Sequence, residues 1–212
     1  MATWANLREL GAKGDGETDD TKAIQEAIDK YDNIYVPQGW YRITETLKMK
    51  PNTKLIGLHP FGTQFRLSES TSTFSGFGAP KAMVESSVGG TNMLVGIGIN
   101  TGGYNYRAVG VKWMANADSY MNDVKFVGGH GGLGKPRPTD SNNAAQRNSW
   151  NRAPRVSSPE NPVAASGMDL AWDNQYWSLW VTNNGGGTFK DIWTASTYAT
   201  NGFYANNTST PG

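Results

Sequence analysis

Hydrophobic residues follow a helical period in one segment near the N-terminus. One apolar stripe at this spacing is formed by Ala23, Ile24, Ala27 and Ile28. Residues whose side chains can cap free helix N–H groups stand just before it: Thr18, Asp19 and Asp20. Gly14 and Gly16 allow a tight turn ahead of the cap. The pattern predicts a helix over 19–30.

After this segment the hydrophobic residues occur in short runs between turn residues. The runs cover 33–36, 40–43, 54–56, 93–95, 108–111, 120–126, 179–181, 189–193 and 203–204. None exceeds about eight residues, which is the usual length of a β-strand. Recurrent short strands separated by turns predict a sandwich, a barrel or a β-solenoid.

An internal repeat favours the solenoid. Val111, Asn116 and Asp123 are matched by Leu179, Asn184 and Asp191, each displaced by the same 68 residues. The shared unit is an apolar strand, an Asn-bearing turn and a strand with Asp before a β-branched residue. Such spacing is expected where one coil stacks on the next. We predict a turn or strand-end role for Asp123 and Asp191.

The stretch 128–166 interrupts this rhythm because it is rich in Gly, Pro, Asn, Arg and Ser and poor in apolar residues. A long loop of this kind in a compact protein is either functional or disordered. We interpret it as an insertion that leaves the solenoid wall.

Composition and charge exclude several classes of protein. The 212 residues carry 19 Lys and Arg against 18 Asp and Glu, so no nucleic-acid partner is expected. There is no Cys, which excludes disulfides and thiolate metal sites. No apolar run is long enough to cross a membrane, and we expect no membrane partner. No signal-peptide pattern is visible.

The segment 10–20, Leu-Gly-Ala-Lys-Gly-Asp-Gly-Glu-Thr-Asp-Asp, together with the apolar stripe after it, resembles the opening motif of pectate-lyase-like β-helix proteins. Ile34-Tyr-Val-Pro37 and Tyr41-Arg-Ile43 continue the resemblance, which is specific over residues 7–58. That superfamily includes rhamnogalacturonases, family 55 exo-β-1,3-glucanases, mannuronan epimerases and phage tailspikes. Residues 172–212 resemble glycoside hydrolase family 55-like and family 28-related proteins.

The resemblance implies an all-β fold, a right-handed parallel β-helix whose N-terminal end is covered by the helix. In this fold we expect a cap over 1–32, first coils over 33–127, the insertion over 128–166 and further coils over 167–212. Asp15, Asp19 and Asp20 are then architectural rather than catalytic. An uncovered solenoid end exposes strand edges. We therefore expect a longer β-helix, completed beyond the open C-terminal end by the rest of a longer chain or by a second polypeptide.

Carbohydrate sites on such proteins lie in a groove along one outer face. Hydrolysis of a glycosidic bond uses two carboxyl groups. Asp169 and Asp173 flank Leu170-Ala-Trp172 at the foot of the insertion, and His130 stands within a run of glycines. These three residues are the predicted catalytic groups.

Aromatic rings offer flat apolar faces on which sugar rings stack. The predicted substrate-binding residues are Trp172, Tyr176, Trp177, Trp180 and Arg152. Trp177 and Trp180 alternate with Leu179 and Val181, so part of this set should face outward. No metal site and no cofactor is predicted; oxygen-ligated Ca²⁺ stays open, although no Asp-rich loop indicates it.

Three functions remain. The first is a secreted or cell-surface glycoside hydrolase that acts on β-glucan or a related polysaccharide. The second is a polysaccharide lyase or uronan epimerase, which needs a base near the sugar C5 proton and a cation for the carboxylate. The third is a non-catalytic, tailspike-like or carbohydrate-binding β-helix.

Overall fold

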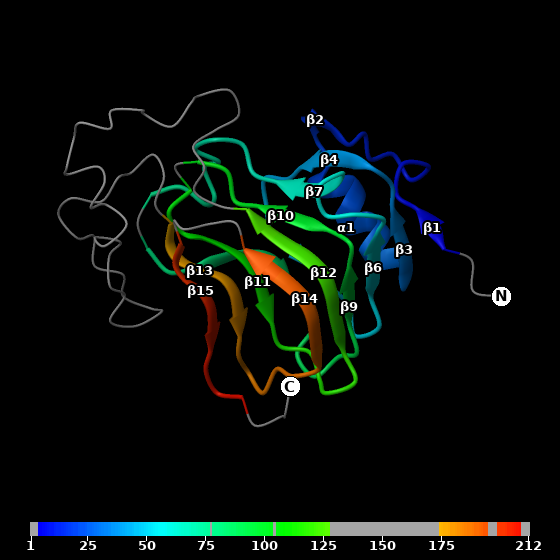
Figure 1. Cartoon of the computed structure of the whole chain (residues 1–212). Coiled ribbons are helices and arrows are strands. Elements are labelled where there is room, and N and C mark those ends of the chain that lie inside the picture. The colour runs from blue at the N-terminus through cyan, green and yellow to red at the C-terminus, as the bar shows by residue number, and fades with distance from the viewer. Residues whose placement is uncertain (1–3, 77, 104, 128–173, 195–198, 209–212) are drawn as a thin grey trace.

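The computed structural model describes residues 4–76, 78–103, 105–127, 174–194 and 199–208 (Figure 1). Within them lie one helix, α1 (Thr21–Lys30), and a series of short strands. The strands are β1 (Ala5–Asn6), β2 (Asp15–Asp19), β3 (Asn33–Val36), β4 (Gly39–Arg42), β5 (Leu47–Lys48), β6 (Lys54–Gly57), β7 (Thr63–Arg66), β8 (Lys81–Glu85), β9 (Met93–Val95), β10 (Gly98–Asn100), β11 (Ala108–Trp113), β12 (Tyr120–Val127), β13 (Asn174–Val181), β14 (Thr188–Thr194) and β15 (Ala199–Ala205).

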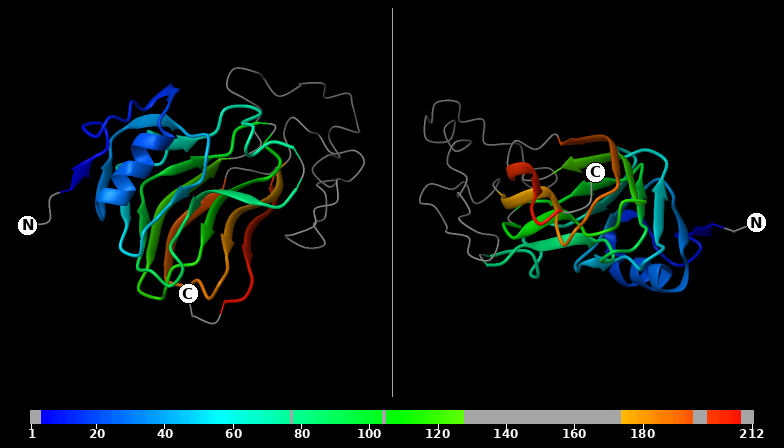
Figure 2. Two further views of the ribbon diagram at one scale, coloured as in Figure 1. Left: turned by 180° about the vertical axis from the view of Figure 1, so that it is seen from behind. Right: turned by 90° about the horizontal axis from the view of Figure 1, so that it is seen from below.

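The strands stack in parallel on three faces, which Figures 1 and 2 show as successive coils along one axis. The first face holds β1, β3, β6, β9 and the first parts of β12 and β14. The second holds β2, β4, β7, β10 and the later parts of β12 and β14. The third holds β5, β8, β11, β13 and β15. The predicted right-handed parallel β-helix is therefore confirmed.

The 68-residue repeat is confirmed as two stacked coils. Val111 pairs with Leu179 on the third face, and Val124 pairs with Ile192 where β12 meets β14. Asp123 and Asp191 both have φ of 50° and mark a bend inside their strands rather than a strand end. In the coil before, Gly96 occupies this position with φ of 64°. The bend lets one long strand pass from the first face to the second.

Side chains alternate between inward and outward positions along the strands, and the inward side chains fill the interior. On the third face the inward column comprises Leu47, Val84, Val111 and Leu179, and all four are buried. On the second face the inward column comprises Tyr41, Phe65, Ile99 and Phe126. Because every coil places an apolar side chain at the same level, the core runs continuously through the coils.

The N-terminal helix packs on this core through its predicted stripe, since Ile24, Ala27 and Ile28 are buried. It begins at Thr21, not at 19, because Asp15–Asp19 form β2 and pair with β4. Asp19 caps it by accepting a hydrogen bond from the Thr21 N–H at 3.0 Å.

The predicted capping role of Asp20 is wrong in its detail. Asp20 stands at the N-cap position but makes no side-chain bond to the helix. Its carboxylate instead accepts hydrogen bonds from the backbone N–H groups of Lys13 at 2.7 Å and Gly14 at 2.9 Å. It therefore holds the glycine turn, which is an architectural role as expected.

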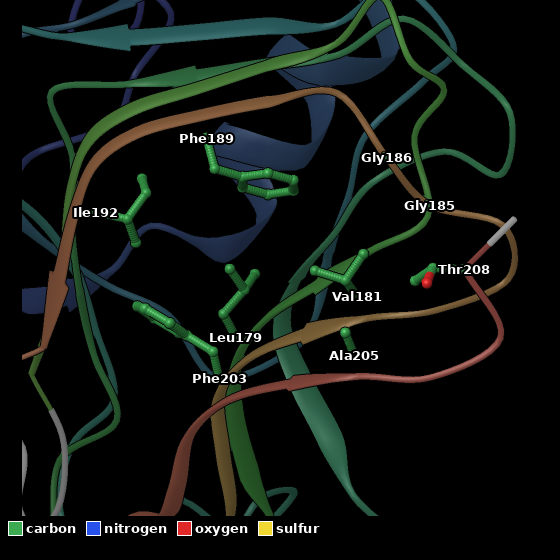
Figure 3. Close-up of a pocket in the computed structure, with 9 residues that line it drawn as sticks. All are labelled: Leu179, Val181, Gly185, Gly186, Phe189, Ile192, Phe203, Ala205 and Thr208. Atoms are coloured by element: carbon green, nitrogen blue, oxygen red, sulfur yellow. The ribbon is translucent and has the colours of Figure 1, made fainter. Parts of the chain in front are cut away.

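The other end of the described stack is apolar. Inward residues of β13, β14 and β15 surround a pocket of about 310 Å³, in which Leu179, Phe189, Ile192 and Phe203 face one another (Figure 3). Phe203 remains 50% exposed although it occupies the core column of the third face. The predicted insertion over 128–166 lies outside the described residues. The chain leaves the second face at Val127 and re-enters the third face at Asn174.

Candidate functional site

The outer side of the third face carries one continuous column of polar and aromatic side chains. The pairing register aligns Lys48, Glu85, Lys112, Trp180 and Tyr204 on consecutive strands. Each stands next to a residue of the inward column, so these side chains point away from the core. Neighbouring strands lie about 4.8 Å apart, so the column extends roughly 19 Å along the axis.

Aromatic rings pack closely at the β13 and β15 end of this column. The Trp177 and Tyr204 rings stack with centroids 4.1 Å apart and planes at 16°. Trp177 also contacts Trp180 at 5.3 Å and Tyr176 at 5.5 Å. The Trp180 indole N–H donates to Asn206 Oδ1 at 2.7 Å, and the Tyr176 hydroxyl donates to the Gly78 carbonyl. The rings are thus held in fixed orientations.

Burial separates the predicted binding residues into two groups. Tyr176 is 0% exposed and Trp177 is 4% exposed. They form a small buried cluster with Ala82 and Val109, apart from the main core. Trp180 and Tyr204 are only partly buried. Trp180 and Tyr204 are thus the partly exposed rings of this cluster, while substrate binding by Trp180, Tyr176 and Trp177 stays a prediction.

Charged groups adjoin these rings. The Lys112 ammonium lies 4.8 Å from the centroid of the Trp180 ring. Glu85 stands between Lys48 and Lys112 in the column, and within the described ranges no Lys or Arg nitrogen lies within 4.0 Å of its carboxylate. A half-exposed acid between two cations can accept hydrogen bonds from sugar hydroxyls while the cations meet anionic groups.

The sequence pattern did not single out Glu85 or Lys112. One signal was available, because the 68-residue displacement places Lys112 opposite Trp180. Glu85 had no such signal, since the coil that carries it differs in length from the next one.

The predicted catalytic residues Asp169, Asp173 and His130 lie outside the described residues, as do Trp172 and Arg152. Asp173 directly precedes Asn174, the first residue of β13, in the sequence. Hydrolysis needs two carboxyl groups. Among the described residues the outer column of this face supplies one, Glu85.

The described ranges contain no group of three or more His, Cys, Asp or Glu side chains placed to hold a metal ion. In the same ranges, no helix is both long and apolar enough to traverse a lipid bilayer.

Comparison with known proteins gives short sequence matches and distant structural ones. The chain is 47% identical over 55 residues to a probable glucan endo-1,3-beta-glucosidase of Arthroderma benhamiae, and 42% identical over 52 residues to the preneck appendage protein of Bacillus phage PZA. Each match covers 24% of this chain and 6% of the relative, so the chain spans a small part of either protein.

The Streptococcus pneumoniae surface protein and adhesin PfbA is a structural neighbour. It is 17% identical, with a TM-score of 0.45, over 85% of this chain and 52% of that one. Residues 4–210 match the family described as rhamnogalacturonase A/epimerase, pectate lyase-like. With nearly the whole chain matched, this protein belongs to that pectate-lyase-like family.

Proposed function

We propose that this chain is part of an extracellular, polysaccharide-active β-helix protein whose glycan lies along the outer column of the third face. The observation that carries the proposal is the register of Lys48, Glu85, Lys112, Trp180 and Tyr204. A column of hydrogen-bonding groups that ends in aromatic rings matches a linear chain of sugars.

The finer activity proposed is that of a glycoside hydrolase acting on β-glucan or a related glycan. The glucosidase of Arthroderma benhamiae supports this choice by its name. Glu85 would be one carboxyl group and Asp173 the other, with Asp169 and His130 as further candidates. Arg152 would contact substrate from the insertion and Trp172 from the chain that follows it.

The test has two parts. Binding of a β-1,3-gluco-oligosaccharide is measured with the chain and with Trp180→Ala; loss of one stacking ring should weaken binding about tenfold. Reducing-sugar release is measured in the complete protein with Glu85→Gln and Asp173→Ala, each of which should abolish turnover. Full turnover by both acid variants would reject the hydrolase, and unchanged binding by Trp180→Ala would reject the third-face site.

A lyase or epimerase is the second candidate, because Lys112 sits beside the Trp180 ring where it could meet a sugar carboxylate. An Azotobacter vinelandii protein named alginate lyase 7 is 41% identical over 64 residues. Appearance of the ultraviolet absorbance of an unsaturated uronide would favour the lyase. Glycan binding without turnover would favour the non-catalytic β-helix, in line with the phage appendage relatives.

For the apolar pocket at the β14 and β15 end, we propose that a further coil of polypeptide covers it. An exposed Phe203 beside two strand edges favours pairing with more strands. Replacing Phe203 with Glu should leave the isolated chain folded. It should also prevent association with the polypeptide that supplies the further coil, as measured by native mass spectrometry. Assembly by the Phe203→Glu variant as in the wild type would reject this partner.

A further inference from the structure

The second face carries a different surface from the third. Three large hydrophobic side chains stay exposed there: Trp40 at 44%, Phe61 at 50% and Trp193 at 37%. The register aligns Trp40, Gln64, Gly98, Lys125 and Trp193 on consecutive strands. Trp40 and Trp193 therefore mark the two ends of an outward column roughly 19 Å long.

Between these tryptophans lie two buried cations. Arg66 is 7% exposed, and its guanidinium carbon lies 4.6 Å from the centroid of the Trp40 ring. Lys125 is 9% exposed, and its ammonium nitrogen lies 3.5 Å from the Phe61 centroid and 4.6 Å from the Trp193 centroid. Each cation is thus held against one of the end rings.

Neither cation has an anionic partner in the described parts of the chain. Among the described residues, no carboxylate oxygen lies within 4.0 Å of either cation, and neither side chain donates a hydrogen bond. Burial lowers the pKa of both Arg66 and Lys125, and no acid in the described ranges opposes that shift. Buried charges are normally paired, so the two unpaired cations indicate a site for an anion from outside.

The segment 58–62 builds this site. Gly98 makes room for it, because a Cβ there would collide with the Pro60 carbonyl oxygen. The segment therefore crosses the second face at β10 and places Phe61 over Lys125, 5.2 Å from the Trp193 ring. Without a glycine at 98 this arrangement could not form.

A groove of about 480 Å³ opens beside Trp40 and Phe61 and includes Asp15 and Gln38. Hydrogen bonds from the Thr18 hydroxyl and from the backbone N–H groups of Thr18 and Glu17 lower the pKa of Asp15 to about 2. This groove therefore offers a hydrogen-bond acceptor for hydroxyl groups, and the cations Arg66 and Lys125 lie beside its aromatic residues Trp40 and Phe61. A ligand with both hydroxyl and anionic groups fits this polarity.

We propose that the second face is an acidic-sugar site, in which Trp40 and Trp193 stack on sugar rings and Arg66 and Lys125 bind their anionic groups. Arg66 and Lys125 stand on strands two steps apart, roughly 10 Å, so they would engage different sugar units. Carboxylate and sulfate groups share the required chemistry. This site is separate from the third-face column and does not depend on the activity proposed there.

The test uses the 212-residue chain and calorimetric titration with three oligosaccharides of equal length. One is a uronate oligomer, one its uncharged methyl ester and one a sulfated oligomer. Lys125→Met removes the ammonium group and keeps an unbranched, flexible side chain that is slightly shorter. Arg66→Met removes the guanidinium group in the same way and leaves a shorter apolar side chain next to Trp40. We expect each variant to bind the anionic oligomer at least about tenfold more weakly than the wild type, as the loss of a charged hydrogen bond implies.

Lys190→Met is the matched control, because Lys190 is exposed on the first-face part of β14 and loses the same charge. It should bind as the wild type does. Preference for the uronate or for the sulfated oligomer identifies the anionic group. The proposal would be overturned if the wild type bound the methyl ester and both anionic oligomers with equal affinity. It would also be overturned if Lys125→Met and Arg66→Met bound the anionic oligomer as tightly as the wild type does.

Measuring turnover of the third-face substrate distinguishes the functions proposed for the two faces. Lys125→Met in the complete protein should bind anionic oligomers weakly and still act on the third-face substrate. If Glu85→Gln and Trp180→Ala have no effect while Lys125→Met and Arg66→Met do, the third-face function fails and the second-face site stands.

Discussion

The second and third faces of the β-helix are built from equivalent columns, yet they present aromatic rings in opposite ways. On the third face Trp177 is buried and the Trp180 N–H is bonded to Asn206, so the rings stabilise one another. On the second face Trp40, Phe61 and Trp193 stay exposed beside cations that have no acidic partner within the described part of the chain. The core fixes the inward positions of both faces alike. Outward positions are therefore free to differ: aromatic rings pack against one another beside the polar column of the third face, whereas those of the second face stay exposed.

The largest expected effect separates buried from exposed tryptophan. Trp177→Ala removes a ring that is 4% exposed and stacked on Tyr204, so it should lower the free energy of unfolding by about 3–5 kcal/mol. Trp40→Ala, at 44% exposure, should cost less than about 1 kcal/mol. Urea denaturation of both variants measures the difference. Similar losses in the two would contradict the contrast between the faces.

The next effect concerns the glycine that admits the crossing segment of the second face. Gly98→Val places a side chain against the Pro60 carbonyl, and we expect a loss of about 1–3 kcal/mol in the free energy of unfolding together with weaker anion binding. Gly202→Ala is the control, because its Cβ would meet only Thr194 Cγ2 at 3.4 Å. Chemical denaturation and titration of the uronate oligomer check both. Wild-type stability in Gly98→Val would show that the segment moves away without cost.

A smaller effect should distinguish binding from stability at Lys125. Its pKa is lowered by burial, so the charged form costs stability at pH values below the pKa of the folded state. That cost disappears as the pH rises above the ordinary lysine value of about 10.4. Lys125→Met should therefore be as stable as the wild type or slightly more stable at pH 7, with the gain vanishing at alkaline pH. Thermal unfolding at pH 7 and pH 10.5 tests this, and a clear loss at pH 7 would mean that the lysine is structural.

The smallest effect lies at the hydroxyl-binding end of the second-face groove. The pKa of Asp15 is about 2, so its contribution to stability is fully present above the unfolded value of about 3.9 and is lost as the pH falls through about 2. Asp15→Asn should remove this part of the acid transition. Unfolding midpoints between pH 5 and pH 2 measure it, with exposed Glu26→Gln as the control. Parallel curves for Asp15→Asn and wild type would contradict the assignment.

Much of the fold was predictable because its signals are local. The apolar stripe gave helix α1 to within two residues at its start, and the 68-residue repeat gave the pairing of Val111 with Leu179. The architectural role of the N-terminal aspartates also held, since Asp15, Asp19 and Asp20 bond to neighbouring backbone N–H groups. The hydrogen-bond partners of Asp20 were predicted wrongly, because the turn at Gly14 decides which backbone N–H groups its carboxylate can reach.

The site was less predictable. Part of the tryptophan set was expected to face outward, without a choice between Trp177 and Trp180. Trp180 is partly exposed, whereas Trp177 packs in a buried cluster that the alternation of β13 did not reveal. The pairing of Phe61 with Lys125 joins residues from separate coils across a crossing segment. No periodicity in the chain encodes that contact.

By itself the sequence determined the helix, nine of the described strands and the family, because each depends on residues close together along the chain. Only the tertiary structure decided which outward side chains meet. The register joins Asn33 to Lys54, Lys54 to Met93, Met93 to Tyr120 and Tyr120 to Thr188, so every coil differs in length. Since the loops absorb those differences, the columns of both outer faces align only after the strands have stacked.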